Sequence, residues 1–151
     1  MSNQQGDFIW YELMTSDPEG ARRFYSAVVG WTIDGQPAGD MDYRMIGAPD
    51  VNVGGMLKLT SDMIAGGARP CWMGYIGVDD VDVSVGAIVA AGGTIIMPAY
   101  DIPGVGRIAM VSDPQGVPFY LMRGASDAVS TVFAVDTVGY CAWNVHTAIL
   151  R

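Results

Sequence analysis

The sequence predicts an α+β fold of two tandem βαβββ modules followed by a C-terminal extension, and three observations lead to this prediction. Hydrophobic residues make up 50% of the 151 residues and charged residues 16%, which is typical of a compact globular protein. A strand-like segment is followed by a helix-like segment and then by three short strand-like segments. This order restarts about 63 residues further along, as a duplicated module would. We expect modules at about 7–60 and 71–124 and an extension at 125–151.

The first module begins with a strand and a capped helix. Residues 7–15 alternate in side-chain character, as in a strand. Asp17 is suited to cap a helix, Pro18 to the first helical position, and Gly30 to the helix end. Ala21, Phe24, Tyr25 and Val28 recur at helical spacing. Glycine, proline and aspartate then separate three expected strands, near 31–34, 43–46 and 53–59.

The second module repeats this order. Its first strand is expected within 71–80, and its helix follows with either Asp79 or Asp80 as the cap. Three strands are expected at 94–99, 106–112 and 116–122. The loop at 100–106 either covers a binding site as a lid or is a plain connector.

Composition narrows the functional classes. Sixteen acidic residues against eight basic ones give a net charge of −8 and a pI near 4.2, which disfavours nucleic acid and anionic membranes as partners. The first residues carry no signal-peptide pattern and no apolar run is long enough to span a membrane, so we expect a cytoplasmic protein. Cys71 and Cys141 are expected to be reduced and buried.

Three segments, at 12–31, 70–82 and 102–122, together resemble the vicinal oxygen chelate superfamily, also called the glyoxalase/bleomycin-resistance/dioxygenase superfamily. The segments read "ELMTSDPEGARRFYSAVVGW", "PCWMGYIGVDDVD" and "IPGVGRIAMVSDPQGVPFYLM". The resemblance extends over about 8–124. It implies that the two modules form a cupped mixed sheet with the helices outside and a cavity for a small molecule inside.

The resemblance also implies four inward-facing positions that hold a divalent metal ion in related proteins, usually through His, Gln or Glu. By motif spacing these positions carry Trp10, Leu57, Met73 and Tyr120. A register shift of two residues would replace them with Glu12, Leu59, Tyr75 and Met122, which supplies one carboxylate. The sole histidine, His146, lies outside the modules. We therefore predict no metal site and no cofactor.

Alternation along the strands predicts which side chains face the cavity. The opposite face should supply the core, through Ile9, Tyr11, Leu13, Trp72, Ile76, Phe119 and Leu121. The cavity face should carry Trp10, Glu12, Met14, Met73, Tyr75, Tyr120 and Met122. This lining of aromatic and methionine side chains with one acid suits a small, largely hydrophobic ligand. The alternative is that these side chains fill the cavity themselves.

Glu12 is the candidate catalytic residue, because a carboxylate on an inward face costs free energy unless it is paired or used. It either acts as a general acid or base, or anchors a polar ligand group, with its pKa raised by apolar neighbours. The structural alternative is an ion pair with Arg107 or Arg44. Arg107 itself either holds a ligand carboxylate or pairs with Glu12 or Asp101.

The leading hypothesis is a small-molecule-binding protein of the glyoxalase type that works without the usual metal site. One alternative is a metal-dependent glyoxalase-like lyase or dioxygenase, and another is a drug-sequestering protein of the bleomycin-resistance type. The sequence leaves open whether the chain is an enzyme. The apolar segment at 129–150 needs to be covered, so we expect a homodimer in which it lies against the partner or across the module junction. Its stretch "YCAWNVHT" is either the start of a further module or a chance echo of "FIWYELMT".

Overall fold

The computed structural model describes residues 3–37, 39–49 and 51–145. These residues form two compact units. The first unit is built on 10–73 with 131–142 of the extension, and the second on 74–130 with the N-terminal residues up to Ile9 and the segment from Trp143. His146 lies outside the described residues. No helix in the described part of the chain has the length and apolar character needed to span a membrane.

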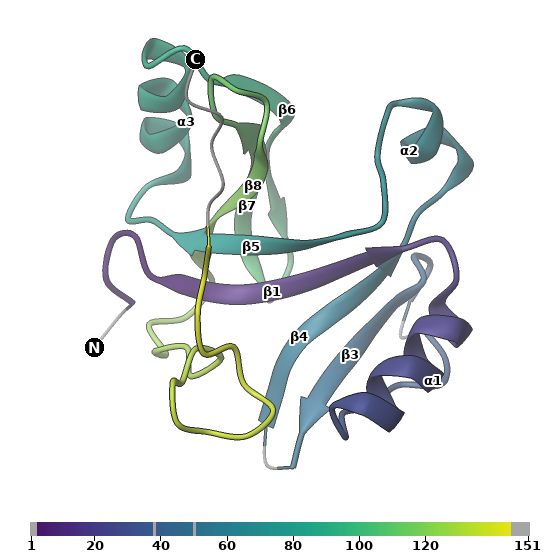
Figure 1. The fold of residues 1–151 in the computed structure, drawn as a ribbon. Coiled ribbons are helices and arrows are strands. Elements are labelled where there is room, and N and C mark those ends of the chain that lie inside the picture. Colours follow the sequence, from purple (N-terminus) through teal and green to yellow (C-terminus); the bar gives the residue numbers. More distant parts are fainter. Residues whose placement is uncertain (1–2, 38, 50, 146–151) are drawn as a thin grey trace. The chain divides into compact units, whose positions relative to one another are not determined.

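The first module has the predicted order of strand, helix and three strands (Figure 1). Its elements are β1 (Phe8–Thr15), α1 (Pro18–Val28), β2 (Thr32–Ile33), β3 (Tyr43–Ala48) and β4 (Val51–Lys58). The strands lie in the order β2-β3-β4-β1, and β1 pairs with β4 in parallel while the other pairs are antiparallel. A short helix that was not expected from the sequence, α2 (Ser61–Ala65), follows β4.

The second module confirms the predicted repeat. Its elements are β5 (Cys71–Gly77), α3 (Val81–Ala90), β6 (Thr94–Ile102), β7 (Gly106–Ser112) and β8 (Pro118–Gly124). They lie in the order β5-β8-β7-β6, with β5 and β8 parallel. Helix α3 packs beside β6, β7 and β8 (Figure 1). Two βαβββ modules are thus present, while the cup that they would form together remains a prediction.

Both long helices begin where the sequence predicts. The Asp17 carboxylate accepts a hydrogen bond from the Gly20 amide at 2.9 Å, which caps α1. The Asp80 carboxylate accepts one from the Val83 amide at 3.0 Å, so Asp80 is the cap of α3. Gly30 has a φ of +80°, which stops α1 in the left-handed conformation that glycine adopts without strain.

The strand register shows that the two modules are not offset by a constant 63 residues. In the first module Glu12 pairs with Gly55, which are 43 residues apart. In the second module Tyr75 pairs with Tyr120, which are 45 residues apart. The single offset is therefore two residues short for the last strand, so the structural counterpart of Tyr120 is Gly55 rather than Leu57. The correspondence at the first strand, which places Tyr75 on Glu12, is unaffected.

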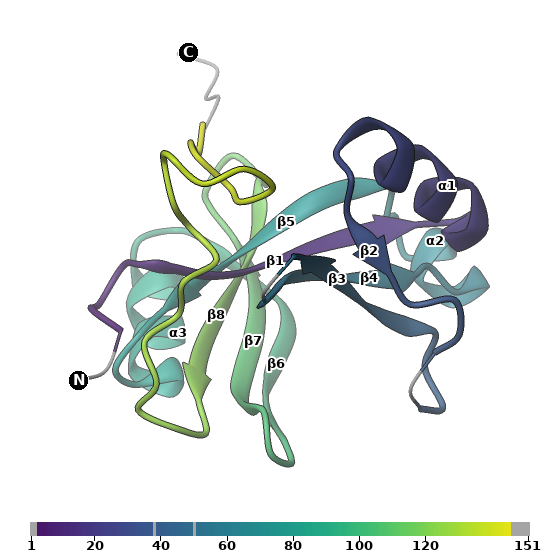
Figure 2. The same ribbon diagram turned by 90° about the horizontal axis from the view of Figure 1, so that it is seen from below.

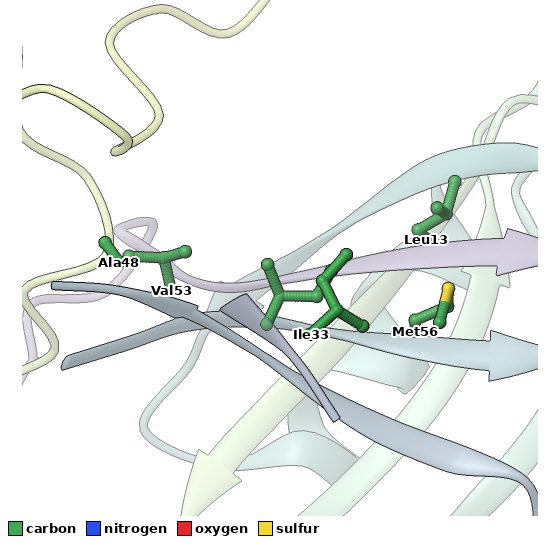
Figure 3. Close-up of a cluster of buried hydrophobic side chains, with 6 residues drawn as sticks. Leu13, Ile33, Ala48, Val53 and Met56 are labelled. Carbon is green, nitrogen blue, oxygen red and sulfur yellow. The ribbon is translucent and has the colours of Figure 1, made fainter. Parts of the chain in front are cut away.

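The core of the first unit lies between α1 and the sheet formed by β1 to β4. Ala21 and Tyr25 of α1 pack against it, and α1 lies next to the short strand β2 (Figure 2). Phe24 and Val28, at the same helical spacing, are 58% and 66% exposed, because they lie on the outer side of α1. The buried cluster, shown in Figure 3, consists of Leu13, Ile33, Ile46, Ala48, Val53 and Met56.

The core of the second unit lies under α3. Its buried cluster consists of Val78, Val81, Ala109, Val111 and Leu121, with Ile76 and Phe119 packed against it. The expectation for Ile9, Leu13 and Leu121 is confirmed, since all three are buried, whereas Tyr11 is half-buried.

Trp72 was expected in the core, but it is 40% exposed. In the first unit its indole N–H donates to the Tyr25 hydroxyl at 2.9 Å, and its ring lies edge-on to Tyr25 and Trp31. Its neighbour Cys71 is exposed and Cys141 is partly buried, so the prediction that both cysteines are buried is wrong.

The loop expected at 100–106 and the extension both differ from long, independent loops. Tyr100 and Asp101 belong to β6, which continues to Ile102 and pairs with β7, so the connector is only the turn between these strands and not a seven-residue lid. The described part of the extension forms a single isolated bridge, between Phe133 and Cys141. Val132 is buried, but Val138 is 89% exposed, so the extension is covered only in part.

Candidate functional site

A cluster of polar side chains surrounds Glu12 on β1 of the first unit. Glu12 is 2% exposed, which is exceptional for a carboxylate. The Tyr43 hydroxyl on β3 accepts a hydrogen bond of 2.9 Å from the indole N–H of Trp10. The charge of the Glu12 carboxylate acts on the same hydroxyl. We refer to Trp10, Glu12 and Tyr43 as the Glu12 cluster.

Gly55 on β4 makes room for this cluster. It is the register partner of Glu12 on one side and of Met45 on the other, so it lies between β1 and β3. A Cβ atom at this position would lie 2.6 Å from Cε1 of Tyr43 and closer still to its hydroxyl. The Tyr43 ring therefore crosses β4 over a backbone without a side chain, and so reaches β1.

The electrostatics of the cluster follow from burial and from the charge of Glu12. Burial raises the pKa of the Tyr43 hydroxyl well above its usual value, and the Glu12 charge raises it further. Although Cys71 is exposed as a residue, partial desolvation of its thiol, followed by the Glu12 charge, raises the pKa of that thiol. Tyr43 therefore stays protonated as a hydrogen-bond donor, and Cys71 is disfavoured as a thiolate nucleophile.

The other expected cavity residues are placed in the two units separately. In the first unit, Met14 and Met73 are buried and Trp10 is half-buried. In the second unit, the rings of Tyr75 and Tyr120 stack with centroids 4.2 Å apart and an interplanar angle of 11°. Met122, also in the second unit, is half-buried.

The arginines pair with acids other than Glu12. Arg107 donates to Asp82 at 2.7 Å and to Asp101 at 3.1 Å, so the alternative of a pair with Asp101 is confirmed. Arg44 is buried and is bound by Asp42 at 2.7 Å and by Glu19. These contacts hold the pKa of both Asp42 and Glu19 below the usual carboxyl range.

The residues present do not fit a divalent metal ion. Trp10, Leu57 and Met73 offer no oxygen or imidazole ligand, and Tyr120 offers a phenol in place of the usual His, Gln or Glu. Within residues 3–37, 39–49 and 51–145, no group of three or more His, Cys, Asp or Glu side chains converges as a metal site would require. Glu12 would be a single ligand, too few for a site of this kind.

A surface hollow of about 430 Å³ lies elsewhere in the first unit, at the outer strands. It is lined by Thr32, Asp34, Met45, Gly47, Ala48, Pro49, Val51 and Asn52. Asp34 accepts a hydrogen bond from the Met45 amide at its edge, so this carboxylate is used in holding β2 to β3. None of the predicted site residues lines this hollow.

Sequence reasoning missed Tyr43 and Gly55. Strand β3 was predicted, but Tyr43 was treated as its first residue and not as a side chain reaching another strand. The signal that points to it is the pair of adjacent glycines, Gly54 and Gly55, inside β4, since a glycine within a strand often marks the close approach of another group.

Comparison with protein families gives a match over residues 8–121 to the Glyoxalase/Bleomycin resistance protein/Dioxygenase superfamily. The chain belongs to this superfamily. The match covers both modules up to Leu121 and ends before the extension. The resemblance inferred from the three sequence segments is thereby confirmed.

Two curated relatives are similar to this chain in sequence. "Putative glyoxylase CFP32" of Mycobacterium tuberculosis is 40% identical over 124 residues, which cover 82% of this chain and 46% of that protein. "Anthracycline biosynthesis protein DnrV" of Streptomyces peucetius is 25% identical over 155 residues, covering 87% of this chain and 52% of that protein. The chain thus spans about half the length of these relatives.

The solved structures share the fold at low sequence identity. A methylmalonyl-CoA epimerase in complex with methylmalonyl-CoA and NH4+ matches with a TM-score of 0.61 and 16% identity, over 83% of this chain and 99% of that chain. Methylmalonyl-CoA epimerase from Mycobacterium tuberculosis matches with a TM-score of 0.59 and 13% identity, over 83% and 93%. At these identities the likeness establishes the fold alone.

Proposed function

We propose that this chain binds a small, largely hydrophobic molecule, that Glu12 contacts the polar group of this ligand, and that no divalent metal ion is needed. The observation that supports the proposal is the burial of Glu12 beside Trp10 and Tyr43. A buried carboxylate costs free energy, and a buried acid among aromatic groups is a common feature of binding and catalytic sites. The donor set around it does not suit a metal ion.

The reaction class that fits this site is proton transfer. A carboxylate oxygen of Glu12 would take a proton from a carbon next to a carbonyl group, or from a hydroxyl group, and return it to the ligand. The name of the CFP32 relative supports a carbonyl-containing ligand. A protein acting in this way would be a glyoxalase-like lyase or isomerase.

A second candidate function is sequestration of a cationic aromatic drug without chemistry. The net charge of −8 and the aromatic side chains next to Glu12 favour a planar cation. The relative named for anthracycline biosynthesis supports an aromatic ligand. Turnover separates the two functions, because a sequestering protein leaves its ligand chemically unchanged.

The experiment compares the wild-type chain with Glu12→Gln, using α-dicarbonyls, aromatic diols and an anthracycline as probes. Glu19→Gln is the matched control, because it makes the same chemical change on α1, away from the Glu12 cluster. A charged hydrogen bond contributes about 1.5–3 kcal/mol, so Glu12→Gln should weaken binding of the best probe about 10- to 100-fold while Glu19→Gln leaves it unchanged. Equal affinity in all three proteins would refute the role of Glu12.

We also propose that the chain forms a homodimer through its extension. Val135 and Val138 are 68% and 89% exposed, and Phe133 is 43% exposed, an apolar surface that a partner copy would cover. The carbonyl of Gly139 accepts a hydrogen bond of 2.7 Å from the Trp31 indole, which holds this part of the extension on the first unit. Light scattering of the intact chain should give twice the mass of 16.1 kDa, and a monomer at micromolar concentration would contradict the proposal.

A further inference from the structure

We infer that Trp10 and Tyr43 select the ligand: their two rings, hydrogen-bonded to each other over Gly55, form a surface for a planar conjugated ring system rather than for a saturated or acyclic compound. This inference deepens the proposed function and rests on it, because the ligand is taken to bind beside Glu12. The contacts that carry the inference lie within the first unit. Tyr43 lies on β3, outside the three segments that carry the family resemblance.

Both rings lie on the face of the first unit's sheet that is turned away from α1. Leu13 of β1 and Ile46 of β3 point to the other face, where α1 packs against the core. Successive side chains of a strand point to opposite faces, and each of the two rings lies an odd number of positions, three, before one of these core residues. Trp10 therefore shares its face with Tyr43 and with Glu12, which lies two positions further along β1.

Gly55 of β4 allows the two rings to meet across an intervening strand. Strand β4 lies between β1 and β3, and its register pairs Gly55 with Glu12 on one side and with Met45 on the other. A Cβ atom at Gly55 would lie 2.6 Å from Cε1 of Tyr43, so the outer end of this ring lies over bare backbone. At that place the Tyr43 hydroxyl accepts a hydrogen bond of 2.9 Å from the indole N–H of Trp10. This bond fixes the two rings relative to each other.

A pair of rings fixed in this way suits a flat ligand. Trp10 and Tyr43 are both partly exposed, whereas Glu12 on the same face is 2% exposed. A planar conjugated ring can stack on an aromatic face or meet its edge, and one such contact raises affinity by up to about tenfold. Because the hydrogen bond already limits the rotation of both rings, binding costs less conformational entropy. A saturated ring of similar size keeps the buried area but loses the aromatic contact, so the two classes of ligand are distinguished here.

The test measures binding of two probes by calorimetry, a naphthalenediol with vicinal hydroxyl groups and the corresponding saturated decalindiol. The wild-type chain should bind the naphthalenediol more tightly. Trp10→Leu should weaken binding of the naphthalenediol about tenfold and change binding of the decalindiol less than about twofold. Trp72→Leu is the matched control, because the Trp72 indole also donates to a tyrosine hydroxyl, that of Tyr25 on α1, at 2.9 Å. This control should bind both probes as the wild type does.

Tyr43→Phe carries the test if Trp10→Leu does not fold, since it keeps the ring and removes only the hydroxyl that fixes Trp10. It should weaken binding of the naphthalenediol by a smaller factor than Trp10→Leu, while Tyr25→Phe leaves it unchanged. A wild-type chain that binds the naphthalenediol no more tightly than the decalindiol, or equal binding by Trp10→Leu and Trp72→Leu, would overturn the inference. If Trp10→Leu weakens binding but Glu12→Gln does not, selection by the rings stands and the proposed role of Glu12 fails; the reverse pattern refutes the rings and keeps Glu12.

Discussion

Replacing Gly55 with alanine tests the central packing feature of the site. The new methyl group would lie 2.6 Å from Cε1 of Tyr43 and closer to the hydroxyl, so the ring has to move. Because Gly55 is flanked by β1 and β3, the backbone has little freedom to yield instead. We expect the Tyr43 ring to leave its place over β4 and to break its bond with Trp10.

The cost can be worked out from three contributions. Inserting a methyl group into a packed site costs about 1–3 kcal/mol. Losing the hydrogen bond between Trp10 and Tyr43 costs about 1 kcal/mol. Replacing glycine within a strand returns about 0.5–1 kcal/mol by restricting the unfolded chain. The net loss is about 2 kcal/mol, which lowers the melting temperature of a chain of this length by roughly 4–8 °C.

Thermal unfolding measures this loss, and Gly86→Ala provides the control. A Cβ at Gly86, within α3, meets no atom within 4 Å, so that variant should gain about 0.5–1 kcal/mol from helix propensity. Near-UV circular dichroism reports whether the Trp10 environment has changed. A Gly55→Ala protein as stable as the wild type, with an unchanged near-UV spectrum, would refute the reasoning about the Tyr43 ring.

Three further predictions concern charge, assembly and metal content. Arg44→Met should lower the free energy of unfolding at pH 7 more than Arg22→Met does, because Arg44 is buried and pairs with Asp42 and Glu19. Since Arg44 lowers the pKa of both acids, the difference in unfolding free energy between the two variants, measured by urea titration, should shrink as the pH falls below about 4. A difference that stays constant with pH would contradict this prediction. Truncation after Gly124 exposes the surface that Val132 and Tyr140 cover, and each buried side chain that is lost removes about 1.5–3 kcal/mol of stability. The truncated protein should therefore be monomeric or insoluble. A soluble and equally stable dimer would show that the extension is dispensable. Elemental analysis of the purified protein should find no stoichiometric Zn, Ni, Fe or Mn, and one ion per chain held within the sheet would disprove the metal-free proposal.

The fold could be predicted because its signals are local. The caps at Asp17 and Asp80, the glycine after α1 and the alternation in β1 each depend on a few neighbouring residues. The family resemblance followed from the same segments. Helical spacing grouped Phe24 with Ala21 and Tyr25 but does not show which side of a helix meets the sheet, and Phe24 is exposed.

The site was predicted only in part because it depends on contacts between distant residues. Alternation identified Glu12 and Trp10 as neighbours on one face of β1. Tyr43, which accepts a hydrogen bond from Trp10, lies 33 residues further along the chain, and its reach depends on Gly55 and on the exact register of three strands. The partners of Arg107 were also open in the sequence, since Asp82 is 25 residues away from it.

The most direct test of the account is the stability that a ligand confers on the wild-type chain and on Glu12→Gln. A ligand at 100 times its dissociation constant stabilises a folded protein by about 2.7 kcal/mol. If Glu12→Gln weakens binding about 100-fold, the same ligand concentration should stabilise that variant by only about 0.4 kcal/mol. Denaturant unfolding of both proteins, with and without the best-binding probe, gives the two values. Equal stabilisation of both proteins would contradict the claim that Glu12 contacts the ligand.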